Sequence, residues 1–243
     1  MINILKKEIN TFFSSLIGYI TIAVFLLITG LFLWVFPETN IINSGFASLD
    51  NFFLMAPWIF MFLIPALSMR SISEEYNTGT IEILNTKPLT DWQIVLGKYF
   101  AVLLLLLASL IPTLIYYYTV YQLGSPIGNI DTGATNGSYI GLMLLAASFS
   151  AIGMFASSLS NNQIVAFILA VFLCFFFYTG FEYLSLLDVF FAKMDHFIEQ
   201  LGLYAHYNSI SRGVVDLRDV VYFISFVVIF LFLTVISLQR RTW

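Results

Sequence analysis

The sequence predicts an all-α integral membrane protein with six membrane-spanning helices. Hydrophobic residues make up 60% of the 243 residues, charged residues make up only 10%, and the apolar residues gather in long uninterrupted runs. Soluble domains carry roughly 25% charged residues, whereas a helix that crosses a bilayer needs about 20 apolar ones. Because a spanning segment must satisfy its own backbone hydrogen bonds, uninterrupted runs of this length indicate helices rather than a barrel.

The first 16 residues are predicted to form an amphipathic helix at the membrane interface. Apolar side chains recur on one face at helical spacing, from Leu5 to Leu16, while Lys6 and Lys7 lie largely opposite. In this position the lysines can reach lipid phosphates while the apolar face rests on the hydrocarbon. The alternative is a plain cytoplasmic extension of the first span.

The whole chain, residues 1–243, is predicted to be one transmembrane domain. Its spans are expected at residues 17–36, 52–69, 95–121, 138–159, 164–187 and 220–238. Pro57 and Pro65 should kink or locally unwind the second span, because proline lacks an N–H and clashes one turn back. The partly apolar interval 188–219 is predicted to form short outer helices that rest on the membrane or re-enter it.

The distribution of basic residues predicts that both termini are cytoplasmic. Seven lie on the side of the N-terminus and three on the other: Lys6, Lys7, Arg70, Lys87, Lys98, Arg240 and Arg241 against Lys193, Arg212 and Arg218. Lysine and arginine are enriched in the cytoplasmic flanks of membrane helices.

Several function classes are disfavoured. The net charge of −4 and the lack of a dense basic patch argue against nucleic acid as a partner. Cys174 is the only cysteine, so no intramolecular disulfide is possible. Gly97-Lys98 lacks the other residues of a phosphate-binding loop. His196 and His206 lack the spacing typical of a metal site. No catalytic, cofactor-binding or metal-binding residue is therefore assigned.

The long polar interval 69–98 contains a strong helix start. Thr90 is the expected N-cap and Gln93 completes a capping box, while Leu89 and Ile94 form a hydrophobic staple around it. Pro88 cannot continue a preceding helix. The third span is therefore expected to begin before the bilayer, after a separate coupling region at residues 70–94.

Upstream of this start, residues 70–87 are predicted to form two short helices joined at residues 77–79. Ser71 followed by Glu74 is a possible capping box, and Gly79 should end the first helix. Apolar residues on such an exposed element favour a protein partner. The alternative is an amphipathic helix lying on lipid.

Three groups of residues in this chain resemble the ABC-2 type transporter permease family. The groups are Glu75, Gly79, Thr80, Glu82, Leu84, Pro88 and Gly97-Lys98; Gly153, Ser157, Ser158, Leu159, Asn162, Gln163 and Ala166; and residues 211–219. The resemblance covers essentially the whole chain. Within the family, the chain most resembles the permease subunits of gliding-motility ABC transporters.

This resemblance implies a multi-pass subunit of a bacterial inner-membrane transporter. It would pair with a second permease, as a heterodimer or homodimer, and with two copies of a separate ABC ATPase that binds the ATP. The residues implied in ATPase docking are Glu74, Glu75, Gly79, Thr80, Glu82 and Pro88. Those implied in helix packing or the permease interface are Gly153, Ser157, Ser158 and Gln163.

Two further interpretations remain open from the residues alone. The chain is either the permease just described or, in the alternative class, a membrane scaffold or secondary carrier without an ATPase. No charge is predicted at a bilayer centre, which disfavours an ion-coupled carrier. Glu182, near the outer end of the fifth span, is either a carboxylate of the transport pathway or an interfacial residue.

Overall fold

The computed structural model describes residues 1–80, 89–186 and 192–241, and these residues form helices and turns without any strand. Six helical stretches among them are long and apolar enough to cross a membrane: Leu16–Trp34, Asp50–Asn77, Asp91–Leu123, Thr132–Leu159, Gln163–Ser185 and Leu217–Arg240. The predicted all-α class with six candidate membrane helices is therefore confirmed.

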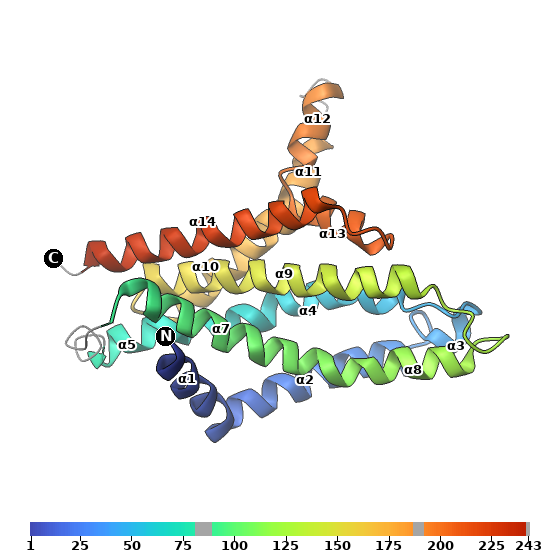
Figure 1. Ribbon diagram of the computed structural model, residues 1–243, viewed down its shortest axis with the longest axis horizontal. Coiled ribbons are helices and arrows are strands. Elements are labelled where there is room, and N and C mark those ends of the chain that lie inside the picture. Colours follow the sequence, from blue (N-terminus) through green and yellow to red (C-terminus); the bar gives the residue numbers. More distant parts are fainter. Residues whose placement is uncertain (81–88, 187–191, 242–243) are drawn as a thin grey trace.

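The helices of the first half run between two ends of the bundle, with α5 at one end and α3 and α8 at the other (Figure 1). They are α1 (Ile2–Ser14), α2 (Leu16–Trp34), α3 (Ile41–Ser44), α4 (Asp50–Ser68), α5 (Arg70–Asn77), α7 (Asp91–Leu110), the 3₁₀ turn η1 (Ile111–Thr113) and α8 (Leu114–Leu123). The second half contains α9 (Thr132–Leu159), α10 (Gln163–Phe175), the π-helical turn η2 (Phe176–Gly180), α11 (Phe181–Ser185), α12 (Ala192–Glu199), α13 (Leu203–Ser211) and α14 (Leu217–Arg241).

The centre of the bundle is α9, which contacts α4, α7, α10, α13 and α14 along its length (Figure 1). Its sequence supplies many small residues, and Ala146, Ser150, Gly153 and Ser157 are all fully or almost fully buried. Small residues let helix backbones approach closely, which is the main source of packing energy between helices in lipid. The small-residue composition of α9 therefore explains its central position.

The prolines of the second span do not unwind it. Pro57 and Pro65 both lie inside α4, which is helical from Asp50 to Ser68. The helical path is first interrupted at Met69, whose N–H still donates to the Pro65 carbonyl at 2.8 Å. The break thus falls one turn after Pro65, at the junction between α4 and α5.

The third and fourth spans are longer than expected. Pro112 creates the 3₁₀ turn η1, and the helix then continues as α8, so the third stretch runs Asp91–Leu123. The fourth begins at Thr132 rather than at residue 138, because the Asp131 carboxylate accepts the Ala134 N–H at 2.9 Å and caps the helix. Gly, Asn and Thr are abundant in this segment and are typical of loops, so composition alone does not predict the helical start at Thr132.

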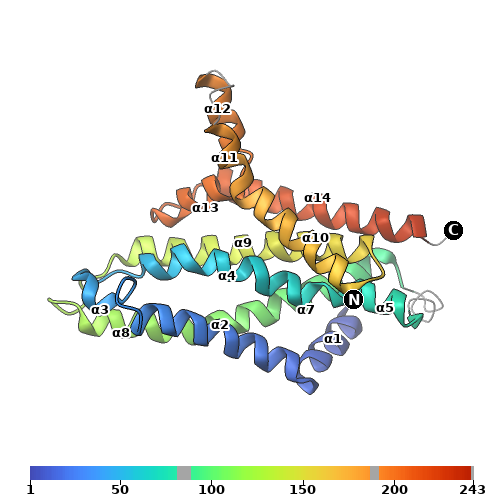
Figure 2. The ribbon, with the colours of Figure 1, turned by 180° about the vertical axis from the view of Figure 1, so that it is seen from behind.

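The fifth span differs most from the expected uniform helix at residues 164–187. It passes from α10 through the π-helical turn η2 into α11, and Figures 1 and 2 show α11 and α12 projecting to the side of the bundle. Short helices do occupy the interval 188–219, as α12 and α13, and α13 packs against α9. The sixth stretch, in α14, extends beyond the expected residues 220–238 at both ends.

The start of α1 and the end of α14 both lie at the end of the bundle that contains α5, which we call the α5 end (Figures 1 and 2). The opposite end, with α3 and α8, is the α8 end. At Ser15 the backbone is extended, and α1 turns back from α2 to pack against α7. Ile4, the one buried residue of α1, sits against Gly97, where a Cβ would lie 2.9 Å from the Ile4 side chain.

Candidate functional site

The candidate site lies at the α5 end, around the short helix α5. One side of α5 is exposed, and we call it the open side. There the Arg70 guanidinium donates to the Glu74 carboxylate through Nε and Nη2, both at 3.0 Å. Both side chains are more than one third exposed. The expected Ser71 capping box is absent, because α5 begins at Arg70 and places Ser71 inside the helix, with Met69 at the N-cap position.

A serine from α9 replaces the missing cap. Ser157 Oγ accepts hydrogen bonds from the N–H groups of Ile72 and Ser73, each at 3.0 Å, and donates to the Met69 carbonyl at 2.8 Å. The first N–H groups of a helix have no partner within the helix, so a buried start needs such an acceptor. This one side chain therefore fixes the α4–α5 junction to the central helix.

A group of four charged residues connects α1, α5 and α7, and we call it the Lys98 cluster. Lys98 Nζ lies 2.8 Å from Glu75 Oε1 and 2.9 Å from Glu8 Oε1. Lys7 Nζ lies 3.4 Å from Glu75 Oε1 and 3.6 Å from Glu8 Oε1. Lys98 is only 2% exposed, whereas the side chain of Lys7 is 57% exposed.

The charges of the Lys98 cluster balance, with two ammonium groups and two carboxylates. Burial lowers the pKa of Lys7, but the carboxylates of Glu8 and Glu75 outweigh it and raise the pKa above its ordinary value. Glu75 Oε2 is buried and has no hydrogen-bond partner among the described residues. Because a buried charge is tolerated only when it is paired, each carboxylate depends on Lys98 for its stability.

At its far end, α5 stops at a left-handed glycine. Gly79 has φ of +70°, and a Cβ at this position would meet no atom within 4 Å, so backbone conformation alone, rather than space, favours glycine here. The Thr78 hydroxyl donates to the Glu74 carbonyl at 2.8 Å and lies 3.0 Å from the Thr80 hydroxyl. Gly79 and Thr80 are exposed. Glu82 and Pro88 lie outside the described residues.

The helix start at α7 contains the reciprocal pair of bonds that defines a capping box. The Gln93 N–H donates to Thr90 Oγ1, and the Thr90 N–H donates to Gln93 Oε1, both at 3.4 Å. Beside this box, Gln239 Nε2 donates to Asp91 Oδ2 at 3.2 Å. The start of α7 is thereby joined to the C-terminal part of α14.

The residues implied in helix packing lie inside this chain. Gly153 faces Ser68 of α4 so closely that a Cβ would lie 1.9 Å from Ser68 Oγ. Ser158 is fully buried, and its carbonyl accepts a hydrogen bond from Ser237 Oγ at 3.0 Å. Gln163, by contrast, is the half-buried first residue of α10. Gly153, Ser157 and Ser158 thus hold α4, α5 and α14 together within the subunit.

The structure brings together some of the implied docking residues and separates others. Glu74, Gly79 and Thr80 lie on the open side, whereas Glu75 is 8% exposed and faces the chain's own lysines. The partners Glu8 and Lys98 were not singled out as a pair from sequence, because 90 positions separate them. Helical periodicity in a sequence relates residues of the same helix, so it does not predict a pair formed by two different helices.

His206 takes part in contacts between two helices. His206 Nδ1 lies 2.6 Å from Asp219 Oδ1, and its ring stacks on Tyr222 with centroids 3.8 Å apart. This pair joins α13 to the first turn of α14. Among the described residues, no group of three or more His, Cys, Asp or Glu side chains is placed to hold a metal ion.

The fold and the site define a polytopic helical membrane protein with a structured polar region at one end of its bundle. Residues 35–238 match the family model described as ABC-2 family transporter protein, so the chain belongs to the ABC-2 transporter family. Membership makes it a transmembrane subunit of an ABC transporter and implies an ABC ATPase as a partner. No curated protein matches the chain.

Proposed function

We propose that this chain is the permease subunit that couples ATP hydrolysis on a separate ABC ATPase to movement of its membrane helices. The observation that carries the proposal is the joining of α5 to the membrane bundle at two points. Ser157 holds the start of α5, and the Lys98 cluster holds its Glu75. A force applied to α5 would therefore reach α9 and α7 directly.

The charge distribution supports a cytoplasmic position for α5. The described basic residues of the α5 end include Lys6, Lys7, Arg70, Lys98 and Arg240, which lie on α1, α5, α7 and α14. Lysine and arginine favour the cytoplasmic side of membrane helices. An ABC ATPase hydrolyses ATP in the cytoplasm, so the open side of α5, with Glu74, Gly79 and Thr80, would face it there.

In this mechanism the docking residues have two different roles. Glu74, Gly79, Thr80, Glu82 and Pro88 form or flank the surface that meets the ATPase. Glu75 points inward and transmits the movement of α5 to Lys98 of α7 and Glu8 of α1. Ion pairs that join two packed elements keep them moving as one body when the geometry is close and the charges are buried.

The assembly and setting of this permease follow from the family resemblance. The proposed complex contains two ATPase copies, which bind the ATP, and a second ABC-2 permease, identical or different, in a bacterial inner membrane. The sequence features shared with gliding-motility ABC transporters favour that machinery as the setting. The complex would then use ATP for transport or for transmission of force.

The alternative is a membrane scaffold or secondary carrier that uses no ATPase. Affinity purification of the full-length chain, co-expressed with the ABC ATPase of its own gene neighbourhood, distinguishes the two functions. The permease should retain the ATPase stoichiometrically, and Gly79→Ala and Glu82→Ala should lower the retained amount while membrane insertion stays unchanged. Glu38→Ala, an exposed carboxylate at the α8 end, is the matched control.

If the chain purified without any ATPase, the scaffold or carrier function would replace the permease. If Gly79→Ala and Glu82→Ala both retained the ATPase like Glu38→Ala, the docking surface would lie elsewhere. These two results are distinct, because the first concerns the existence of the complex and the second concerns its contact residues.

A further inference from the structure

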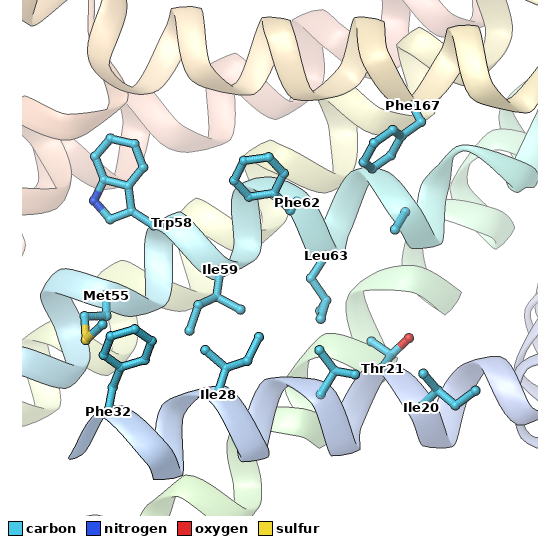
Figure 3. A pocket seen from close by; sticks show the side chains of 12 residues that line it. Ile20, Thr21, Ile28, Phe32, Met55, Trp58, Ile59, Phe62, Leu63 and Phe167 are labelled. Atoms are coloured by element: carbon cyan, nitrogen blue, oxygen red, sulfur yellow. The ribbon is translucent and has the colours of Figure 1, made fainter. Parts of the chain in front are cut away.

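Two cavities of this protein differ sharply in polarity. An apolar groove of about 690 Å³ opens between α2 and α4, and Figure 3 shows Trp58, Phe62 and Ile28 among the side chains that line it. Its described lining contains no charged residue. A smaller cavity of about 230 Å³ lies between the end of α12, α13 and the first turn of α14, and both histidines of the chain, His196 and His206, line it. Any proton that a histidine of this chain takes up is therefore bound beside this second cavity.

His206 makes two hydrogen bonds, and both of its partners are acceptors. Its Nδ1 lies 2.6 Å from Asp219 Oδ1, and its Nε2 lies 2.9 Å from the carbonyl oxygen of Gln200. A neutral imidazole carries a hydrogen on only one of its two nitrogens. In either neutral tautomer, a nitrogen lone pair would face an oxygen lone pair at hydrogen-bond distance. Both bonds form together only when the pair holds one proton more than a neutral histidine and a carboxylate.

The surroundings of the pair place this proton on the imidazole. Imidazole is ordinarily a stronger base than a carboxylate. The His206 ring stacks on Tyr222 with centroids 3.8 Å apart, and a tyrosine face attracts a cation. The Asp219 side chain is only 9% exposed, and its Oδ2 is buried without a hydrogen-bond partner among the described residues. Since a buried carboxylate needs a counter-charge, an imidazolium at His206 stabilises Asp219.

The remaining charges around this cavity are more exposed than Asp219. The other titratable or charged residues that line it are His196, Glu199, Tyr204 and Arg212. His196 Nδ1 lies 3.7 Å from Glu199 Oε2, the two side chains are 72% and 49% exposed, and Arg212 is exposed as well. The Lys193 side chain, also on α12, lies outside the described residues. Water and salt screen exposed charges, and among the described charges Asp219 alone lies within ion-pair distance of the ring.

The bonds of His206 join three elements at the base of a projection. Gln200 directly follows α12, His206 lies in α13, and Asp219 lies in the first turn of α14. Beside them, the Tyr222 hydroxyl donates to the Leu201 carbonyl at 2.6 Å. Helices α11 and α12 project from the bundle, and we call them the projecting arm (Figures 1 and 2). The bonds of His206 and Tyr222 therefore hold the chain where it returns from the projecting arm.

We propose that His206 and Asp219 form a proton-dependent clamp on the projecting arm. With the extra proton, His206 bonds to both Asp219 and the Gln200 carbonyl, and the base of the arm stays fixed to α14. When this proton passes to water, the neutral imidazole keeps only one of the two bonds, and Asp219 loses its cation. The clamped state binds more protons than the released state, so low pH favours it and it is lost as the pH rises. No step involves an ATPase, so the clamp is independent of the proposed coupling.

Hydrogen exchange of the full-length chain in phosphatidylcholine nanodiscs tests the clamp. The readout is the protection of the amides at residues 200–203, corrected for the intrinsic pH dependence of exchange. It is measured at about pH 5.5 and about pH 8, on either side of the ordinary pKa of histidine. Wild-type protection should fall about tenfold between the two pH values, which corresponds to ~1.4 kcal/mol.

Three variants separate the proton from the hydrogen bonds. In Asp219→Asn the amide can donate to an unprotonated Nδ1 while the Nε2 hydrogen still bonds to the Gln200 carbonyl, so protection should be high at both pH values. His206→Phe keeps a ring against Tyr222 but makes neither bond, so protection should be low at both. His196→Gln removes the other histidine, which is exposed, and should behave as the wild type does.

Nitrogen-15 NMR of the His196→Gln protein reads the proton directly, because His206 is then the only histidine. An imidazolium is expected at the lower pH and a neutral ring at the higher pH. A ring that is neutral at both pH values would overturn the clamp. So would wild-type protection that does not change with pH, a wild-type pH dependence in Asp219→Asn, or its loss in His196→Gln. If His206→Phe does not fold, the other three proteins still decide between these outcomes.

Discussion

Lys98 Nζ lies 2.8 Å from Glu75 Oε1, so that a residue of α7 and a residue of α5 form a buried ion pair at the α5 end. Glu8 of α1 shares the same ammonium group at 2.9 Å. Residues of α1 and α5 thus both pair with the single ammonium group of Lys98 in α7. Because α5 carries the proposed docking surface, this ion pair connects that surface to the membrane helix α7.

Removing the Lys98 charge should destabilise the protein strongly. Lys98→Met leaves Glu8 and Glu75 close together with only the exposed Lys7 as a counter-charge, and breaking one side of a buried pair costs about 3–5 kcal/mol. Thermal unfolding of the purified protein in detergent measures the loss. The control is Lys6→Met, since Lys6 is exposed.

The same cluster predicts non-additive effects. When Lys98→Met is combined with Glu75→Gln, one of the two unpaired charges disappears, so the double variant should be less destabilised than the sum of the single variants. A strictly additive result would mean that Lys98 and Glu75 do not interact in the membrane-embedded protein.

Loss of the Ser157 hydroxyl should loosen α5. Ser157→Ala removes the acceptor of the Ile72 and Ser73 amides and the donor to the Met69 carbonyl. Leaving buried backbone groups unpaired costs about 1–3 kcal/mol. Hydrogen exchange should therefore accelerate at Ile72 and Ser73.

Ser158→Ala provides the matched control for this experiment. Within the described part of the chain, its hydroxyl donates to the Phe155 carbonyl of its own helix, at 2.7 Å. Equal acceleration in both serine variants would exclude a specific role for Ser157.

Gly153→Ala should be destabilising through overpacking. The added Cβ would lie 1.9 Å from Ser68 Oγ and 2.7 Å from Ser68 Cβ, so α4 and α9 must separate. Overpacking of this kind costs about 1–3 kcal/mol. Gly30→Ala is the control, because its nearest contact, Tyr116 Oη, lies at an ordinary 3.5 Å. A Gly153→Ala protein as stable as the control in thermal unfolding would contradict the close approach of the two helices.

Thr90→Ala should weaken the start of α7. The change removes the side-chain acceptor of the Gln93 N–H, and loss of an N-cap costs about 1 kcal/mol. Thr90→Ser keeps the hydroxyl and should restore the stability. The free energy of unfolding of the three proteins tests this, and an unaffected alanine variant would show that tertiary contacts alone hold the start of α7.

The parts of the structure that were predictable from sequence depend on local patterns. Apolar runs predicted six membrane helices, and the spacing of Thr90 and Gln93 predicted a capping box that the structure contains. Gly79 was expected to end a helix and does stand at a positive φ after α5. Each pattern lies within a few neighbouring residues, where steric and hydrogen-bonding rules act directly.

The parts that sequence reasoning missed depend on contacts between helices. The pairing of Lys98 with Glu8 and Glu75 requires the relative rotation of α1, α5 and α7, which no single segment encodes. For the same reason, the inward direction of Glu75 was not predicted, and Ser157 could not be recognised as the cap of α5.

The most direct test of the central claim is ATP hydrolysis by the complex of this chain with its ATPase in nanodiscs, compared between wild type and Glu75→Gln. The proposed mechanism predicts that the variant retains the ATPase in the wild-type ratio, while stimulation of hydrolysis falls about tenfold, which corresponds to ~1.4 kcal/mol of coupling free energy. Unchanged stimulation in the variant, or a wild-type chain that neither binds nor stimulates the ATPase, would contradict it.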